Sequence, residues 1–411
     1  MKITLQEIFR SEFPRYQESH GLSKEQYRAA NAIMHCGREE MGYEEWVCAE
    51  DGYKERRYHS CRHRSCPRCN GKKALEWFEK TRERLLPCDH YHVVLTLPHE
   101  LNTLWHYNRS WCADRLLKAS TETLQQLLKD ERYLGGKAGM LAALHTWGRT
   151  LSFHPHVHIL VTGCGMRGDR LVRAKRNFLL PVGVVKAKFR GKWLAWLNEG
   201  YESGDLRLPE DMSEREWKKL LTRISRKEWN VRIEGAYRHG EGVACYLSRY
   251  FRGGPIKNER LISNEGDRVG FRYQDYRDGK TKTMILSKAH FLSRVMWHVP
   301  PKGIHTVRHY GLYASGAKRK REILRKLLGQ RSFGMKVLKK PSKLENRCPK
   351  CGAELYRRRK VGAKNSYVKV YVPGIGDDHV QQGVQADRNY LGCSPPKVRG
   401  NFFRLSAGCL T

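Results

Sequence analysis

One short segment, residues 153–161 with the sequence FHPHVHILV, most constrains the fold of this chain. Alternate residues of a β-strand point to the same face of a sheet, so His156 and His158 would lie side by side. The apolar residues 159–161 indicate that the strand is buried at one end, and buried imidazoles need polar partners. Two histidines on an exposed strand are the alternative interpretation. The segment therefore favours a sheet that holds a metal ion on a histidine pair.

A large excess of positive charge narrows the class of partner. The 411 residues include 78 Lys and Arg against 42 Asp and Glu, a formal net charge of +36, which predicts a polyanionic partner. Nucleic acid fits better than an anionic membrane surface, because no basic amphipathic helix with a broad apolar face is visible. Hydrophobic residues make up 40% of the chain, enough for folded domains, and the length suggests two or three of them.

The cellular location is predicted from features that the sequence lacks. No uncharged apolar run of about 18 residues is present, and the N-terminal sequence has no apolar region of the kind found in signal peptides. We therefore expect a soluble, cytoplasmic protein that is not secreted.

A second motif places two tyrosines in a segment of helical character, residues 241–251. Tyr246 and Tyr250 are four residues apart and would share one helical face, with Arg249 and Arg252 near them. A tyrosine oxygen can attack a phosphodiester and retain it as a phosphotyrosine, while arginines neutralise the phosphate oxygens. A packing pair is the alternative interpretation. The tyrosine pair indicates phosphodiester chemistry only in combination with the histidine pair.

Thirteen cysteines are present, an odd number, and several are clustered like metal ligands rather than like disulfide partners. The N-terminal cluster predicts one tetrahedral zinc site, because a CxxC pair places two thiolates within reach of one ion. This peptide is too polar to bury five free thiols in a core. The predicted ligands are Cys48, Cys61, Cys66 and Cys69, with Cys36, His59 and His63 in reserve.

The C-terminal region contains a second CxxC pair, Cys348 and Cys351, which resembles half of a zinc ribbon. Its second pair could be Cys393 and Cys409, although that spacing is loose, and a tail without zinc is the alternative. Basic runs at 318–321 and 357–360 are consistent with contacts to a DNA backbone.

The order of expected elements predicts an α+β protein with a central antiparallel sheet flanked by helices. Three domains are expected: a zinc-binding, DNA-binding domain over 1–75, a catalytic domain over 76–315 and a basic C-terminal region over 316–411. Residues 166–239 could be an insertion into the catalytic domain. Strands are expected at 90–98, 139–146, 154–162, 229–234, 256–262, 268–274 and 281–286, helices at 100–132, 213–226 and 241–251, and an N-cap at Ser287.

Together, the histidine and tyrosine motifs carry a family resemblance. The chain resembles the transposases of rolling-circle insertion sequences, the two-tyrosine branch of the HUH (His-hydrophobic-His) endonucleases, for which insertion sequence 91 is the prototype. His156 and His158 match the HUH motif, and Tyr246 and Tyr250 match the tyrosine pair. The similarity extends to about residue 355. Further similar stretches follow in the same order at 93–98, 144–158, 271–284 and 298–311.

The resemblance implies DNA strand transfer with the fold of an HUH endonuclease. One tyrosine would attack single-stranded DNA at an element end, leaving a 5′-phosphotyrosine and a free 3′-OH, and the second would act at the target. The implied partners are single-stranded DNA, DNA hairpins at element ends and target DNA, in a bacterial cytoplasm at the nucleoid.

The resemblance also implies a third metal ligand beside the histidine pair. His145, on the neighbouring predicted strand, is the first choice and His154 the second, and a core histidine is the alternative interpretation of His145. Imidazoles in general also suit zinc or copper, whereas the resemblance implies Mg²⁺ or Mn²⁺.

Related transposases carry a zinc-binding domain whose motif YNSCRxRxCPxC is similar to residues 57–69. Where relatives often have a second cysteine after the counterpart of Cys48, this chain has Asp51, so the fourth zinc ligand stays open. Two other functions also remain open: a plasmid replication initiator or relaxase with the same chemistry, and a zinc-dependent DNA-binding regulator without catalysis.

Overall fold

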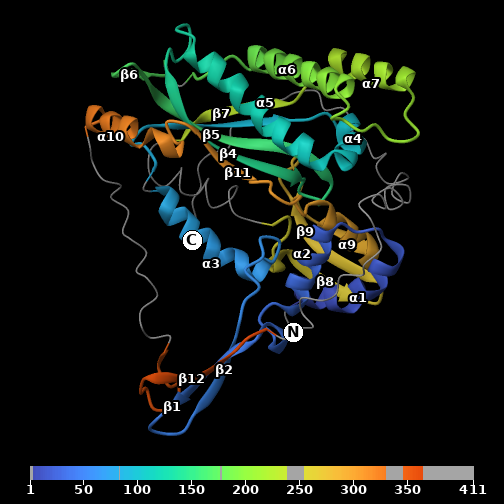
Figure 1. Cartoon of the computed structure of the whole chain (residues 1–411), viewed down its shortest axis with the longest axis vertical. Coiled ribbons are helices and arrows are strands. Elements are labelled where there is room, and N and C mark those ends of the chain that lie inside the picture. The colour runs from blue at the N-terminus through green and yellow to red at the C-terminus, as the bar shows by residue number, and fades with distance from the viewer. Residues whose placement is uncertain (1–2, 83, 176–177, 238–253, 330–345, 364–411) are drawn as a thin grey trace.

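An antiparallel sheet lies at the centre of the molecule (Figure 1). The computed structural model describes residues 3–82, 84–175, 178–237, 254–329 and 346–363. Within these residues the strand order is β11-β4-β5-β3-β7, and β6 pairs with the end of β5. The strands are β3 His90–Thr96, β4 Lys137–Trp147, β5 Phe153–Arg167, β6 Arg170–Arg173, β7 Val231–Tyr237 and β11 Val307–Gly311. The prediction of an α+β fold with a central antiparallel sheet is confirmed.

The two faces of this sheet pack against different elements. Val157 and Ile159 of β5 belong to the large apolar core beneath the helices α4 to α7, whereas Leu160 belongs to a smaller core with α10. Because side chains alternate along a strand, His156 and His158 lie on the face opposite the large core. The helices are α4 Asn102–Tyr107, α5 Arg109–Lys129, α6 Val182–Glu202, α7 Glu214–Arg226 and α10 Lys318–Leu327.

Two sequence predictions about this part of the chain need correction. The helix expected over 100–132 is divided, because Asn108 leaves the helical conformation and its side-chain amide donates to the carbonyl oxygens of Leu104 and Arg207. The region 166–239, expected as a possible insertion, ends in a strand, β7, that pairs with β3, so its last residues belong to the central sheet. The hydrophobic pattern located these elements but could not show which strand β7 joins.

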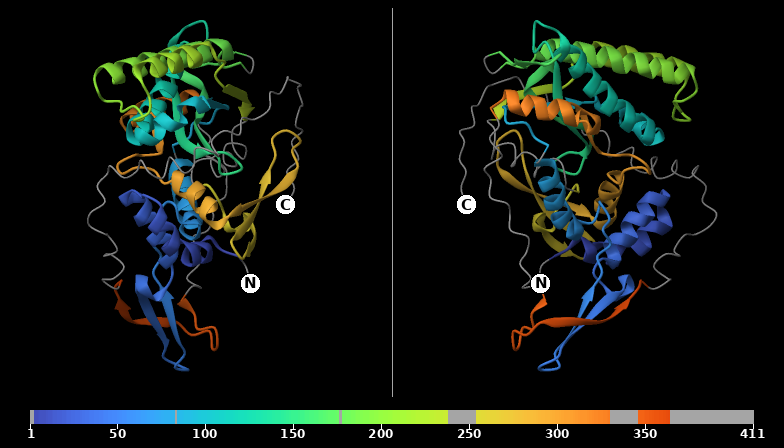
Figure 2. Two further views of the ribbon diagram at one scale, coloured as in Figure 1. Left: turned by 90° about the vertical axis from the view of Figure 1, so that its right-hand side faces the viewer. Right: turned by 60° about the vertical axis from the view of Figure 1, so that its left-hand side comes forward.

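The N-terminal helices share an apolar core with helix α9 and a second antiparallel sheet. Helix α9, N-capped by Ser287 as predicted, lies between this sheet and the helices α1 and α2 (Figure 2). The first 75 residues therefore share a core with residues 256–299, and the expected boundary falls inside α3. The elements are α1 Leu5–Ser19, α2 Lys24–His35, α3 Pro67–Arg82, β8 Leu261–Glu265, β9 Arg268–Gln274, β10 Thr281–Ser287 and α9 Lys288–Trp297.

A third antiparallel sheet lies at the end of the molecule farthest from helices α5 to α7 (Figure 1). Its order is β12-β1-β2, so strands from the two ends of the sequence are neighbours. The predicted C-terminal region is thereby divided, since α10 packs on the central sheet and β12 joins β1. The strands are β1 Tyr43–Cys48, β2 Lys54–Tyr58 and β12 Leu355–Val361, and the short 3₁₀ helices are η1 Glu39–Met41, η2 His99–Leu101, η3 Asn258–Arg260 and η4 Ser315–Ala317.

Among the described residues, no helix combines the length and the apolar character that a membrane crossing requires.

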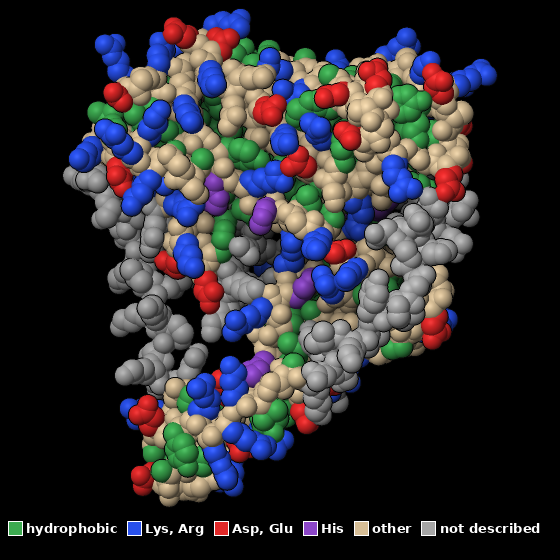
Figure 3. Space-filling view, viewed as in Figure 1, with side chains coloured by type: hydrophobic (Ala, Val, Ile, Leu, Met, Phe, Trp, Pro, Cys, Tyr) green, Lys and Arg blue, Asp and Glu red, His purple; other side chains and the backbone are tan. Residues whose placement is uncertain are grey.

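Basic side chains are spread over one face of the molecule (Figure 3). Lys and Arg side chains occur over the whole face shown in Figure 3, from the helices at the top to the three-stranded sheet at the bottom.

Candidate metal centres

Three histidines meet where β4 and β5 are paired. His145 lies opposite His156 in the register, and His158 follows on the same face of β5. One ring nitrogen from each lies within 4.8 Å of the others, and the side chains are only 9%, 8% and 7% exposed. The structure thus brings the predicted pair and the first-choice third ligand together. His154, the second choice, has an exposed side chain and lies outside this group.

Hydrogen bonds assign the tautomers of these rings. Nδ1 of His156 lies 2.6 Å from the carbonyl oxygen of His154 and therefore donates, which leaves a lone pair on Nε2. When His92 is neutral, its Nδ1 donates to Oε2 of Glu234 at 2.8 Å and its Nε2 accepts from Nδ1 of His158 at 2.9 Å. The Nε2 atoms of His156 and His158 then face each other at 3.0 Å with two lone pairs. This arrangement is repulsive unless a cation lies between them.

The donor set fits a divalent cation. Two nitrogens bound at about 2.1 Å and at right angles to each other stand about 3.0 Å apart. Burial lowers the pKa of His156 and of His158 well below the usual value, and the neighbouring His145 lowers both further. The imidazoles are therefore neutral at neutral pH, the form that binds a metal.

Glu234 and His92 support the cluster from the neighbouring strands β7 and β3. The hydrogen bond from His92 is the main cause that lowers the pKa of Glu234 to about 2, and the hydroxyl of Tyr237 also donates to Oε2 at 2.8 Å. The carboxylate is therefore charged and fixes the orientation of His92. Sequence reasoning missed both residues. The alternation of His90 and His92 along the predicted strand was the available signal, but the β3–β7 register was not visible.

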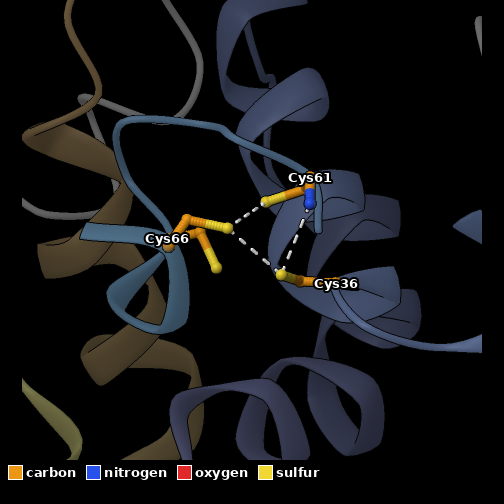
Figure 4. A group of neighbouring side chains, drawn as sticks. Cys36, Cys61 and Cys66 are labelled. Atoms are coloured by element: carbon orange, nitrogen blue, oxygen red, sulfur yellow. Dashed lines mark hydrogen bonds between the residues drawn. The ribbon is translucent and has the colours of Figure 1, made fainter. Parts of the chain in front are cut away.

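Four cysteines form a second cluster between α2 and α3, and Figure 4 shows three of them, Cys36, Cys61 and Cys66. Sγ of Cys69 lies 3.4 Å from Sγ of Cys36 and 3.5 Å from Sγ of Cys61, and Cys66 completes the group. Thiol hydrogen bonds from Cys61 and Cys66 lower the pKa of Cys36 to about 2, so a thiolate is stabilised here. Four sulfurs at this spacing are the ligand set of a structural zinc site.

One predicted zinc ligand is wrong. Cys48 ends strand β1 and belongs to another group, and Cys36, at the C-terminal end of α2, occupies the fourth position. The reserve candidates His59 and His63 also lie outside this cluster, with ring nitrogens 3.2 Å from the carbonyl oxygen of Met41 and from the backbone nitrogen of Ser65.

Two families of known proteins match this chain. The family described as "Transposase zinc-binding domain" matches residues 8–97, and the family described as "Putative transposase" matches residues 139–321. The chain is 35% identical over 313 residues to "Putative transposase y4qJ" of Sinorhizobium fredii, covering 74% of this chain and 79% of that protein. The chain belongs to the insertion sequence 91 family of transposases.

A second relative of this transposase is also an insertion-sequence transposase. It is "Transposase for insertion sequence element IS801" of Pseudomonas savastanoi pv. phaseolicola, 29% identical over 309 residues, which are 72% of each chain. No solved structure shows a significant match. The zinc-binding family covers Cys36, Cys61, Cys66 and Cys69, which agrees with a structural zinc ion at this cluster.

Several predicted residues of the transposase cannot be placed. Tyr246, Tyr250, Arg249 and Arg252 lie outside the described residues, as do Cys393 and Cys409. The C-terminal CxxC pair, Cys348 and Cys351, lies beside Cys48 and Asp51.

Proposed function

We propose that this transposase cleaves and rejoins single-stranded DNA in rolling-circle transposition, through 5′-phosphotyrosine intermediates. The observation that carries the proposal is the pair of Nε2 lone pairs of His156 and His158, which converge at 3.0 Å on a buried face. A transposase of this family needs a DNA-cleaving centre, and this histidine cluster lies within the matched residues 139–321.

His145, His156 and His158 would hold Mg²⁺ or Mn²⁺, with His92 and Glu234 fixing the ring of His158. The bound cation would supply positive charge that polarises the scissile phosphodiester. Burial lowers the pKa of His156 and of His158, so both rings are in the neutral form that binds a metal.

Tyr246 or Tyr250 supplies the nucleophile in this proposal. The phenol loses its proton and its oxygen bonds to phosphorus, while the bond from phosphorus to the 3′-oxygen breaks and that oxygen takes up a proton. The second tyrosine cuts or receives the strand at the target, and attack by a 3′-OH on the phosphotyrosine rejoins the DNA. Arg249 and Arg252 neutralise the phosphate oxygens.

The DNA partners in this proposal are single-stranded DNA, hairpins at the element ends and target DNA. Helix α7 offers one basic surface, because Lys219, Arg223 and Arg226 are exposed and spaced for one helical face. With a net charge of +36, the protein would bind DNA phosphates at several such surfaces and associate with the nucleoid.

Covalent capture tests the proposal. The full-length protein is incubated with labelled single-stranded oligonucleotides and Mn²⁺, and an adduct that withstands boiling in detergent is expected. The double variant Tyr246→Phe/Tyr250→Phe should form no adduct, and Tyr276→Phe, a 62% exposed tyrosine on the surface, should form it normally.

A test variant and a control variant examine the histidine cluster separately. His156→Ala should abolish the adduct while DNA binding persists, and His305→Ala, an exposed histidine outside the cluster, should behave as the unaltered protein. An adduct formed by the double tyrosine variant, or metal-dependent cleavage by His156→Ala, would contradict the proposal.

A further inference from the structure

A second cysteine-containing group joins the two ends of the described chain. Cys48 and Asp51 come from the β1–β2 hairpin, and Cys348 and Cys351 come from the loop before β12. One ligand atom from each lies within 4.8 Å of the others. Sγ of Cys48 is 3.5 Å from Sγ of Cys351, and Sγ of Cys348 is 3.1 Å from Oδ2 of Asp51.

The hairpin turn orients the carboxylate toward the sulfurs. Oδ1 of Asp51 accepts the backbone N–H of Tyr53 at 2.9 Å, which directs Oδ2 to Cys348. On the opposite side, the backbone N–H of Lys350 donates to Sγ of Cys348 at 3.4 Å, and such bonds stabilise a thiolate. Both ligand-bearing loops are therefore shaped around the same point.

The spacing suits zinc. Two thiolates bound at about 2.3 Å in a tetrahedron stand roughly 3.8 Å apart, close to the separation of Cys48 and Cys351. Three thiolates and one carboxylate are ligands that zinc accepts, whereas Mg²⁺ and Ca²⁺ require oxygen donors.

The apolar contacts around the group are few. In the described residues, the apolar cluster around this group consists of the buried Cys48, Cys348 and Leu355, with Trp46, Tyr53 and Ala353 partly buried against them. A core of this size supplies little stabilisation, and small domains of this kind usually depend on a metal or on disulfides. The pairing of β1 with β12, about 300 residues apart in sequence, carries a large loop-closure cost that a cross-link would offset.

We propose that Cys48, Asp51, Cys348 and Cys351 bind a second structural zinc ion, which fastens the segment before β12 to the N-terminal hairpin. The site is separate from the four-cysteine cluster and from the histidine cluster, and it does not depend on the proposed cleavage chemistry. It holds the basic residues 357–360 of β12 beside β1.

Zinc content tests the site in the full-length protein. Relative to the unaltered protein, Cys351→Ser should lose one zinc per chain, Cys66→Ser should lose one at the other cluster, and the combined variant should lose two. Glu50→Ala, which removes an exposed acidic residue next to Asp51, should keep the full zinc content. Unchanged zinc content in Cys351→Ser would overturn the proposal.

The identity of the fourth ligand has a separate readout that does not depend on the stability of a cysteine variant. Asp51→Cys should keep its zinc, and after cobalt substitution its thiolate charge-transfer absorption should rise in proportion to one added thiolate, from seven to eight over the two sites. Cys393→Ser/Cys409→Ser should keep the full zinc content. Loss of one zinc in that double variant, or unchanged cobalt absorption in Asp51→Cys, would show that Asp51 is not the ligand.

Discussion

At the scale of single residues, His92 sets the protonation state of the histidine cluster. Its Nδ1 bonds to Glu234 and its Nε2 to Nδ1 of His158, so Nε2 of His158 is the ring atom that faces His156 at 3.0 Å. A charged carboxylate behind a histidine ligand orients the ring and raises its basicity. His92 is a positioning residue in the proposed centre rather than a ligand, since its ring faces His158 and Glu234.

The first prediction concerns this arrangement. His92→Ala should weaken the binding of Mn²⁺ at the cluster by about 10- to 100-fold, because Nδ1 of His158 loses its acceptor and the ring its orientation. Electron paramagnetic resonance of Mn²⁺ measures the affinity, and cleavage should recover at high Mn²⁺. Tyr237→Phe, which removes one donor to Glu234 and keeps the His92 contact, is the matched control. Equal Mn²⁺ affinity in His92→Ala and the unaltered protein would contradict the role.

The second prediction concerns His298, which lies outside the metal clusters. Burial is the main cause that lowers its pKa to about 3, with contributions from Arg109 and Arg294, and its ring nitrogens contact Thr146 and the carbonyl oxygen of Leu151. Between pH 6.5 and pH 3 the unfolded state binds a proton that the folded state does not bind. The folded state is therefore destabilised as the pH falls through this range.

The lowered pKa of His298 sets the size of this loss of stability. Between pH 7 and pH 5.5 the unaltered protein should lose about 1 kcal/mol more unfolding free energy than His298→Gln, which has no titrating group at this position. Urea unfolding at the two pH values measures the difference. The same pH dependence in both proteins would contradict a neutral, buried His298.

At the scale of elements, the helices and strands could be predicted better than their partners. The alternation of residues 153–161 predicted β5, and Ser287 predicted the start of α9, because both signals are local. The β7–β3 and β12–β1 pairs join distant segments, and nothing local encodes their register. For that reason the sequence could place His145, His156 and His158 together, whereas it placed Cys48 with cysteines that the structure puts in another group.

The third prediction concerns the zinc cluster that joins α2 and α3. Cys66→Ser should release one zinc and loosen this junction, because metal-binding free energy is folding free energy in small metal-dependent modules. Limited proteolysis should then cleave the variant between residues 36 and 69, and it should leave this segment of the unaltered protein intact. Cys112→Ser is the control, since this buried cysteine of α5 lies outside both cysteine clusters. A zinc content equal to that of the control would rule out Cys66 as a ligand.

At the scale of the whole molecule, the basic charge and the metal centre have separable roles. The charge is spread over the helices and the three-stranded sheet, whereas the histidine cluster occupies one buried face of the central sheet. Binding to DNA phosphates is electrostatic and depends on salt, whereas in the proposed mechanism the metal would act only on the bond to be broken. Variants of the basic surface should therefore change DNA affinity, and variants of the histidine cluster should change cleavage.

The last prediction applies this separation to α7. Replacing Lys219, Arg223 and Arg226 together by Gln should weaken the binding of single-stranded DNA of any sequence, because these exposed side chains form one basic face. If each contacts one phosphate, the slope of log K against log[salt] should become shallower by about 2, at about 0.7 per phosphate. Lys218→Gln is the control, since Lys218 already pairs with Glu214 at 2.6 Å and should change the slope little. A triple variant with the original slope would exclude α7 from the DNA-binding surface, and binding that weakens for one sequence alone would indicate base recognition in place of phosphate contact.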